Sequence, residues 1–160
     1  MTSAARVEPG SGTATVTTGL PILDHLLGTL AQGGRFDLWL EIDPDDPAAE
    51  VDAAGSALGR ALRDIVPDGA LGEAAVPSDE ALAMVVLERS GRALVASNAD
   101  LTGVGGLGSD LPARFLRALA EELGLTVHVR LIEGEDTDHV LAAIFRALGL
   151  ALARAAATTT

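Results

Sequence analysis

The amino-acid sequence predicts an α/β protein built from two similar halves, each with a sheet and two covering helices. Two stretches carry the prediction: LPILDHLLGTLAQGGRFDLWLEID, which starts at Leu20, and LPARFLRALAEELGLTVHVRLIE, which starts at Leu111. Each opens with Leu-Pro, continues with the periodicity of an amphipathic helix, passes a glycine and ends in the alternation of a half-buried strand. An acidic loop and another helix follow both, so we interpret the pattern as an internal duplication. The halves would meet through their helices, or each sheet would pack against a shared helical layer.

The first half is expected to span about 12–66, after a small, polar and flexible arm at 1–11. Pro21 suits the first turn of a helix, and the Gly33-Gly34 pair ends it. The acidic, proline-bearing loop DPDDPAAE then delays the second helix. We therefore expect a strand at 14–17, a helix at 21–32, a strand at 36–42 and a helix at 53–64.

The second half is expected to span about 79–156, after a connection at 66–78 that is rich in glycine and proline. Ser90-Gly91 favours a turn between two antiparallel strands. The expected elements are strands at 81–87 and 93–98, a helix at 111–123, a strand at 125–133 and a helix at 137–155. With 160 residues, the two halves are predicted to form a single domain, 1–160.

The chain is strongly acidic, with 23 Asp and Glu residues against 11 basic residues, all arginine, and a formal net charge of -12. Such a field argues against nucleic acid and anionic membranes as partners, and a small anionic ligand would need a local arginine site. Cysteine is absent, and no apolar run approaches the roughly 18–20 residues of a membrane span. These features predict a soluble, cytoplasmic protein.

The segment GVGGLG at 103–108 matches the glycine pattern of dinucleotide-binding loops. It begins too late in the chain for more than one strand–helix–strand unit, and Leu111-Pro112 delays the helix that would face the phosphates. The preceding strand is also expected to pair in a hairpin. We therefore prefer a flexible loop to a nucleotide site.

Three histidines, His25, His128 and His139, are the natural metal-ligand candidates. His25 lies beside Asp24 among leucines, and His128 lies mid-strand between valines. His139 follows Asp138 in GEDTDHVLAAIFRAL, where alanines occupy the i+3 and i+4 positions of the helix. Metal sites usually need three or four donors. Spacing alone therefore favours acids that cap the helix and complement its dipole over a metal site.

Six motifs lie in a characteristic order from Thr18 onward: TGLPILDHLL, GGRFDL, VPSDEAL, SGRAL, LTVHVRLIEGEDTDH and AAIFRAL. Together they resemble the imidazoleglycerol-phosphate dehydratase family, whose members remove water from imidazole glycerol phosphate in histidine biosynthesis. The resemblance implies a helical layer between two mostly antiparallel or mixed sheets, which agrees with the duplication. It also implies self-assembly as trimers that metal joins into larger cages.

The same resemblance implies a mechanism with two manganese ions, held mainly by two His-His-x-x-Glu helices. In this sequence we read the first of these helices after Val51-Asp52, with the glutamate removed by a short deletion. The second keeps one histidine and loses its glutamate, and a further family histidine falls on an arginine. The positions that have lost a ligand would then be Ala53, Ala54, Arg114 and Ala142.

The residues that still match the family's ligands are His25 and His139, with Asp138 as a substitute oxygen donor. Arg92 and Arg146 match phosphate-binding positions by resemblance, together with Ser90 of the Ser-Gly-Arg motif. The N-terminal region, which brings a strand and a glutamate to the substrate in the family, is shortened.

Two histidines and one aspartate cannot hold two manganese ions in the family manner, so we expect no bound cofactor and an impaired or absent reaction. The leading hypothesis is a dehydratase-like pseudoenzyme that keeps the fold and forms homo-oligomers, with trimers or larger assemblies left open. A first alternative is an altered enzyme with a single-metal site at His25, His139 and Asp138. A second is a non-catalytic subunit that assembles with an active dehydratase.

Overall fold

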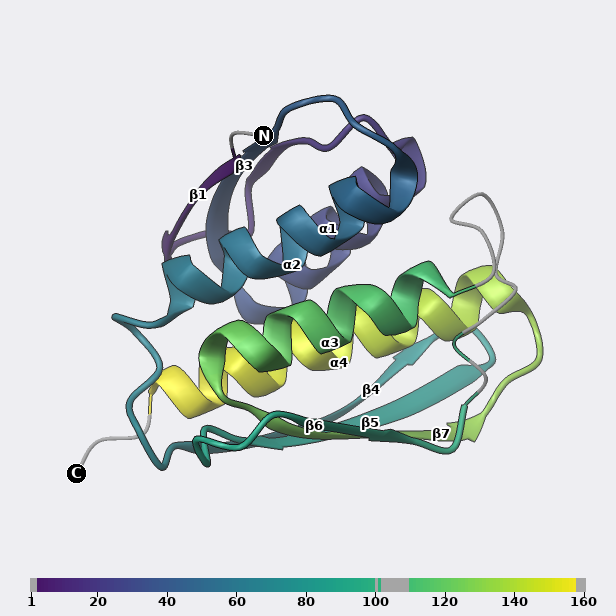
Figure 1. The fold of residues 1–160 in the computed structure, drawn as a ribbon. Helices are drawn as coiled ribbons and strands as arrows, with labels where there is room; N and C mark the ends of the chain where they lie inside the picture. The colour runs from purple at the N-terminus through teal and green to yellow at the C-terminus, as the bar shows by residue number, and fades with distance from the viewer. Residues whose placement is uncertain (1–2, 100, 102–109, 158–160) are drawn as a thin grey trace.

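A computed structural model describes residues 3–99, 101 and 110–157 of the chain. Two sheets lie on the outside and the helices lie between them, with α1 and α2 against the first sheet and α3 and α4 against the second (Figure 1). The described helices are α1 (Pro21–Gly34), α2 (Pro47–Leu62), α3 (Leu111–Leu123) and α4 (Thr137–Ala156). The predicted fold class, helices between two mixed sheets, is confirmed.

The two sheets share one arrangement of strands. The first has the order β1-β3-β2, in which β1 is antiparallel and β2 parallel to the central β3. The second has the order β4-β5-β7-β6, in which β5 is antiparallel and β6 parallel to β7. Strand β4 has no counterpart among the described residues of the first sheet. The strand bounds are β1 (Ser3–Pro9), β2 (Ala14–Thr17), β3 (Phe36–Ile42), β4 (Leu71–Ser78), β5 (Ala81–Glu88), β6 (Leu94–Ser97) and β7 (Thr126–Glu133).

Strand β1 corrects the prediction of a flexible arm at 1–11. Ala5 and Val7 are partly buried and pack against the core, while Ala4, Arg6 and Glu8 face outward. Arg6 lies over the Trp39 ring of β3, 5.1 Å from its centroid. The alternation was hard to recognise because its inward side chains are small and Pro9 follows at once.

Helix α2 begins at Pro47, six residues before the predicted start. The Asp46 carboxylate accepts a hydrogen bond from the backbone N–H of Ala49 (2.9 Å), and proline fits the first turn that follows. The Asp-Pro pair in the acidic loop is therefore a helix-start signal that the prediction missed. The connection expected at 66–78 likewise contains β4, whose inner positions are filled by small buried side chains.

The core between the sheets consists mainly of leucine, alanine and valine, with Phe115 and Phe145 packed at its centre, their ring centroids 5.5 Å apart. Helix α4 has the length and apolar content of a membrane span. Ten of its residues are buried against β4, β5 and α1, which makes it the central core helix.

Glycines allow the helices of the two halves to approach closely. Gly149 on α4 lies against the carbonyl oxygen of Leu30 on α1, and Gly33 on α1 lies against that of Arg146 on α4. A Cβ atom at either glycine would overlap the facing oxygen. Gly55 on α2 lies against the carbonyl oxygen of Phe115 on α3, at a somewhat longer distance. The crossings α1–α4 and α2–α3 therefore both require glycine.

Gly149→Ala is expected to destabilise the protein by about 1–3 kcal/mol, because the new methyl group overlaps the Leu30 carbonyl. Gly28→Ala in α1 is the matched control, since nothing lies within 4 Å of its Cβ position. There the higher helix propensity of alanine should stabilise the protein by about 0.5–1 kcal/mol. Urea unfolding measures both changes, and a stabilising Gly149→Ala would contradict the close crossing.

Candidate functional site

A groove between α1 and α4 brings together four of the residues singled out from the sequence. His25 and Asp138 line a cavity of about 370 Å³ with apolar side chains of both helices. His25 also lines a neighbouring cavity of about 450 Å³, which contains Ala142 and Arg146. We call these two adjoining cavities the α1–α4 groove.

Helix periodicity explains which side chains face the α1–α4 groove. Asp138, Ala142 and Arg146 are spaced four residues apart on α4 and therefore share one face. His25 and Thr29 are spaced in the same way on α1. The groove thus has an acid at one end, a histidine in the middle and a cation at the other end, where the Arg146 guanidinium donates to the carbonyl of Pro77 (3.2 Å).

Asp24, the neighbour of His25, fixes the start of α1. Its carboxylate accepts hydrogen bonds from the backbone N–H (3.0 Å) and the hydroxyl (2.5 Å) of Thr18, which is fully buried. The two polar residues of the Leu-Asp-His motif therefore have different roles. The aspartate anchors the preceding turn, and the histidine lies in the groove.

His139 belongs to a separate cluster of acids at the start of α4. Its Nδ1 is hydrogen-bonded to Glu80, and its Nε2 lies 3.4 Å from an Asp79 carboxylate oxygen, both in the turn between β4 and β5. Asp136 lies 3.8 Å from Nδ1. The hydrogen bond to Glu80 is the main cause that raises the pKa of His139, with smaller contributions from the charges of these acids and an opposing one from desolvation.

The caps of α2 and α4 correct the predicted register of the lost ligands. Asp136 caps α4 by accepting from the backbone N–H of His139 (3.1 Å), as Asp46 caps α2. Counted from the caps, the counterparts of Asp138, His139 and Ala142 are Ala48, Ala49 and Asp52. On this count Asp52, and not a deletion, takes the place that the resemblance gives to the glutamate, and Ala53 and Ala54 lie further along α2.

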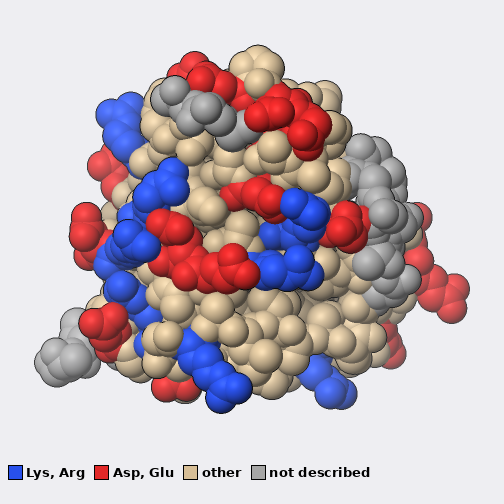
Figure 2. Space-filling view, viewed as in Figure 1, with Lys and Arg blue, Asp and Glu red and all other residues tan. Residues whose placement is uncertain are grey.

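Asp52 is bound by Arg114, the residue to which the family resemblance assigns a further lost histidine. The guanidinium donates two hydrogen bonds to the carboxylate, Nη2 to Oδ2 at 2.5 Å and Nε to Oδ1 at 3.2 Å. Hydrogen bonding to Asp52 is the main cause that raises the pKa of Arg114 above its usual value. Figure 2 shows acidic and basic side chains intermixed across the face of the molecule that Figure 1 also views. A fixed cation thus joins α2 to α3.

The described side chains of one chain do not fit the metal centre that the family resemblance implies. Among them, no group of three or more His, Asp or Glu side chains is arranged to hold a metal ion. His25 and Asp138 share a cavity, whereas His139 lines neither part of the α1–α4 groove. The single-metal site expected from His25, His139 and Asp138 is therefore not assembled within the chain.

The predicted phosphate-binding residues are divided between two places. Ser90 and Arg92 lie in the turn after β5, where the Ser90 hydroxyl is 2.8 Å from that of Thr126 and accepts from the Arg92 backbone N–H (3.1 Å). Arg146 lies toward the other end of β5, because its guanidinium contacts the carbonyl of Pro77, just before the Asp79-Glu80 turn. The eight residues of β5 separate that turn from the Ser90 turn by about 25 Å. Arg92 therefore does not join Arg146 within one chain. The GVGGLG segment lies outside the described residues.

Comparison with known proteins gives one consistent family. The model of the imidazoleglycerol-phosphate dehydratase family matches residues 18–152. The chain is 38% identical over 156 residues to the imidazoleglycerol-phosphate dehydratase of Desulforudis audaxviator, covering 92% of this chain and 80% of the relative. It is 39% identical over 155 residues to that of Moorella thermoacetica, with coverages of 91% and 79%.

Solved structures agree with the sequence comparisons. The crystal structure of imidazoleglycerol-phosphate dehydratase from Staphylococcus aureus matches with a TM-score of 0.85 at 28% identity, over 98% of this chain and 94% of that one. A crystal structure of the protein from Pyrococcus furiosus matches with a TM-score of 0.81 at 29% identity, over 94% and 86% of the two chains.

The His139 cluster should make stability depend on pH. Because the pKa of His139 is raised in the folded state, its pairing stabilises the fold fully below the unfolded pKa of about 6.5 and is lost as pH rises through the higher folded pKa. Urea midpoints from pH 6 to 9 should fall more for the wild type than for His139→Gln. His128→Gln, an exposed strand histidine, should behave like the wild type. Parallel wild-type and His139→Gln curves would contradict the pairing.

Proposed function

Because this chain belongs to the imidazoleglycerol-phosphate dehydratase family, a lyase family of histidine biosynthesis, we propose that it keeps the family's fold and self-association while its dehydratase reaction is impaired. Relatives that are 38–39% identical bear the name of the active enzyme. The proposal therefore depends on the residues at a few ligand positions and not on the overall similarity.

The Asp52–Arg114 pair is the observation that carries the proposal. By resemblance, both positions supply manganese ligands in the family. Here the guanidinium already neutralises the carboxylate and holds both of its oxygens. Ala48 and Ala49, in the first turn of the same helix, offer no donor atoms. A divalent cation placed here would meet a fixed positive charge in place of a histidine.

The α1–α4 groove supports binding of a small anionic ligand. Arg146 supplies the positive charge, and His25 and Ser78 supply hydrogen-bonding groups beside it. A second candidate function is altered acid–base chemistry, which the shared cavity of His25 and Asp138 favours. A role as a non-catalytic subunit of an active dehydratase remains a further proposal. We place the protein in the cytoplasm, with neither nucleic acid nor membrane as a partner.

We also propose that the outer face of the second sheet forms the contact between copies in a homo-trimer. Among the residues that the structure describes, three large apolar side chains are prominently exposed, and all three lie on this sheet: Leu71 of β4 (58%), Leu94 of β6 (44%) and Ile132 of β7 (51%). Strand register places Leu71 and Leu94 on the face turned away from the helices, where Met84 and Val86 of β5 are half-buried, and Ile132 is exposed at the irregularity in the β5–β7 pairing. Large apolar side chains exposed on one sheet favour burial by another copy.

Purified protein is expected to bind imidazole glycerol phosphate without converting it when manganese is present. Arg146→Ala should weaken binding about tenfold or more, because a charge-assisted hydrogen bond is lost. Arg6→Ala is the control, because it also removes one arginine charge but lies on β1, outside the groove. Calorimetry measures binding, and product formation is measured beside the Moorella thermoacetica relative. Turnover comparable to that relative would refute the proposed impairment.

The double variant Leu94→Asp, Ile132→Asp is expected to dissociate the trimer, because it places charges within the apolar contact. Thr15→Asp, on the exposed face of the first sheet, should leave the assembly intact. Light scattering measures the mass of each variant with and without manganese. A wild-type mass that increases with manganese would show metal-driven assembly and contradict the proposed loss of the metal sites.

A further inference from the structure

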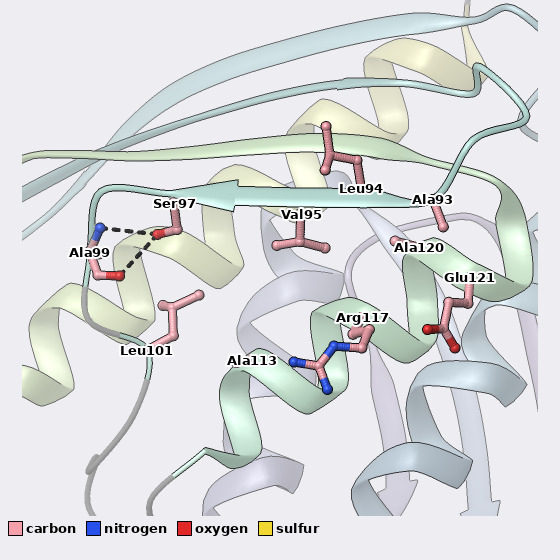
Figure 3. Close-up of a pocket in the computed structure, with 10 residues that line it drawn as sticks. All are labelled: Ala93, Leu94, Val95, Ser97, Ala99, Leu101, Ala113, Arg117, Ala120 and Glu121. Carbon is pink, nitrogen blue, oxygen red and sulfur yellow. Dashed lines mark hydrogen bonds between the residues drawn. The ribbon is translucent and has the colours of Figure 1, made fainter.

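A second cavity, of about 500 Å³, lies between strand β6 and helix α3 and shares no lining residue with the α1–α4 groove. Alanines such as Ala113 and Ala120 leave space on the helix side. Figure 3 shows Val95 pointing from β6 toward the helix while Leu94 points away from it. The volume lies within the range of small-molecule sites, roughly 300–1,000 Å³.

Two opposite charges from one helix border this cavity. Arg117 and Glu121 lie one turn apart on α3, and both side chains line it (Figure 3). Neighbours at this spacing commonly pair with each other. Within the described part of the chain, however, neither side chain has a hydrogen bond or an ion pair. Arg114 and Glu122, on the same helix, are both paired. The two charges at the cavity are therefore available to a ligand.

The apolar part of the cavity faces these charges from the strand side. Val95 comes from β6 and Leu101 from the segment that follows it, and Leu101 is only 7% exposed. A ligand that satisfies the whole site must carry a negative group, a positive group and a short apolar group. The protein's net charge of -12 also disfavours a ligand that is simply anionic.

We propose that this cavity binds a free α-amino acid with an aliphatic side chain. The Arg117 guanidinium donates to the ligand carboxylate, for which its planar fork is suited. The Glu121 carboxylate accepts from the ligand ammonium group, and the aliphatic side chain packs against Val95 and Leu101. A carboxylic acid without an amine, or an amine without a carboxylate, would leave one protein charge unpaired. This site is independent of the dehydratase reaction.

Calorimetry with the full-length protein tests the proposal using L-leucine and L-valine, with isovalerate and isoamylamine as ligands that carry one charge each. We expect the amino acids to bind at least about tenfold more tightly than the single-charge ligands. Arg117→Ala and Glu121→Gln should each weaken leucine binding by a similar factor. Arg6→Ala and Glu8→Gln repeat these charge changes on β1, far from the cavity, and should leave binding unchanged.

Ala113→Leu provides a variant that keeps every charge. It fills the cavity from a partly buried helix position with a good helix former, so the protein should fold and lose leucine binding. The proposal is overturned if neither amino acid binds at millimolar concentration. It is equally overturned if isovalerate binds as tightly as leucine, or if Arg117→Ala binds leucine like the wild type. Binding of an extended apolar peptide in place of amino acids would assign the cavity to strand addition at β6 instead.

Discussion

The close crossing of helix backbones at glycine is the constraint on which the rest of this structure depends. Each crossing joins a helix of one half to a helix of the other, α1 to α4 and α2 to α3. At Gly149 and Gly33 the backbones approach so closely that a single methyl group would meet a carbonyl oxygen. The helices of each half therefore have their apolar faces covered by the other half, and the two halves share one core.

The crossings also determine where chemistry can occur. On α4, Ala142 and Arg146 occupy the turns before Gly149, so the α1–α4 groove opens directly beside the crossing. On α2, Asp52 occupies the turn before Gly55, where α3 brings Arg114 against it. The two helix crossings therefore have the same arrangement, but the side chains beside them differ. Beside the α1–α4 crossing lies a groove lined by His25, and beside the α2–α3 crossing lies the ion pair of Asp52 and Arg114.

In so acidic a protein, the pairing of each arginine decides which surfaces can bind anions. Arg63 and Arg114 join α2 to α3 through acids, and Arg89 is paired with Asp68, which leaves these cations neutralised. Arg146 contacts a backbone carbonyl, which leaves its charge uncompensated by that contact. Arg117 borders a cavity, and no acid among the described residues forms an ion pair with it. The two proposed ligand sites therefore lie where the arginines are not already neutralised by a carboxylate.

By itself, the sequence determined the duplicated α/β architecture, most element positions and the family, because helix and strand periodicity and the motif order are local properties. It placed His25, Asp138 and Arg146 on helix faces that the structure brings to one groove. The sequence analysis missed two features with weak local signals. These are β1, whose inward residues are small, and the start of α2, where the Asp-Pro cap resembled a loop. Only the tertiary structure decided the pairing of Asp52 with Arg114, 62 residues away, and of His139 with Glu80, 59 residues away. Charges so distant in sequence meet through the packing of helices and turns, and no periodicity within a segment encodes that meeting.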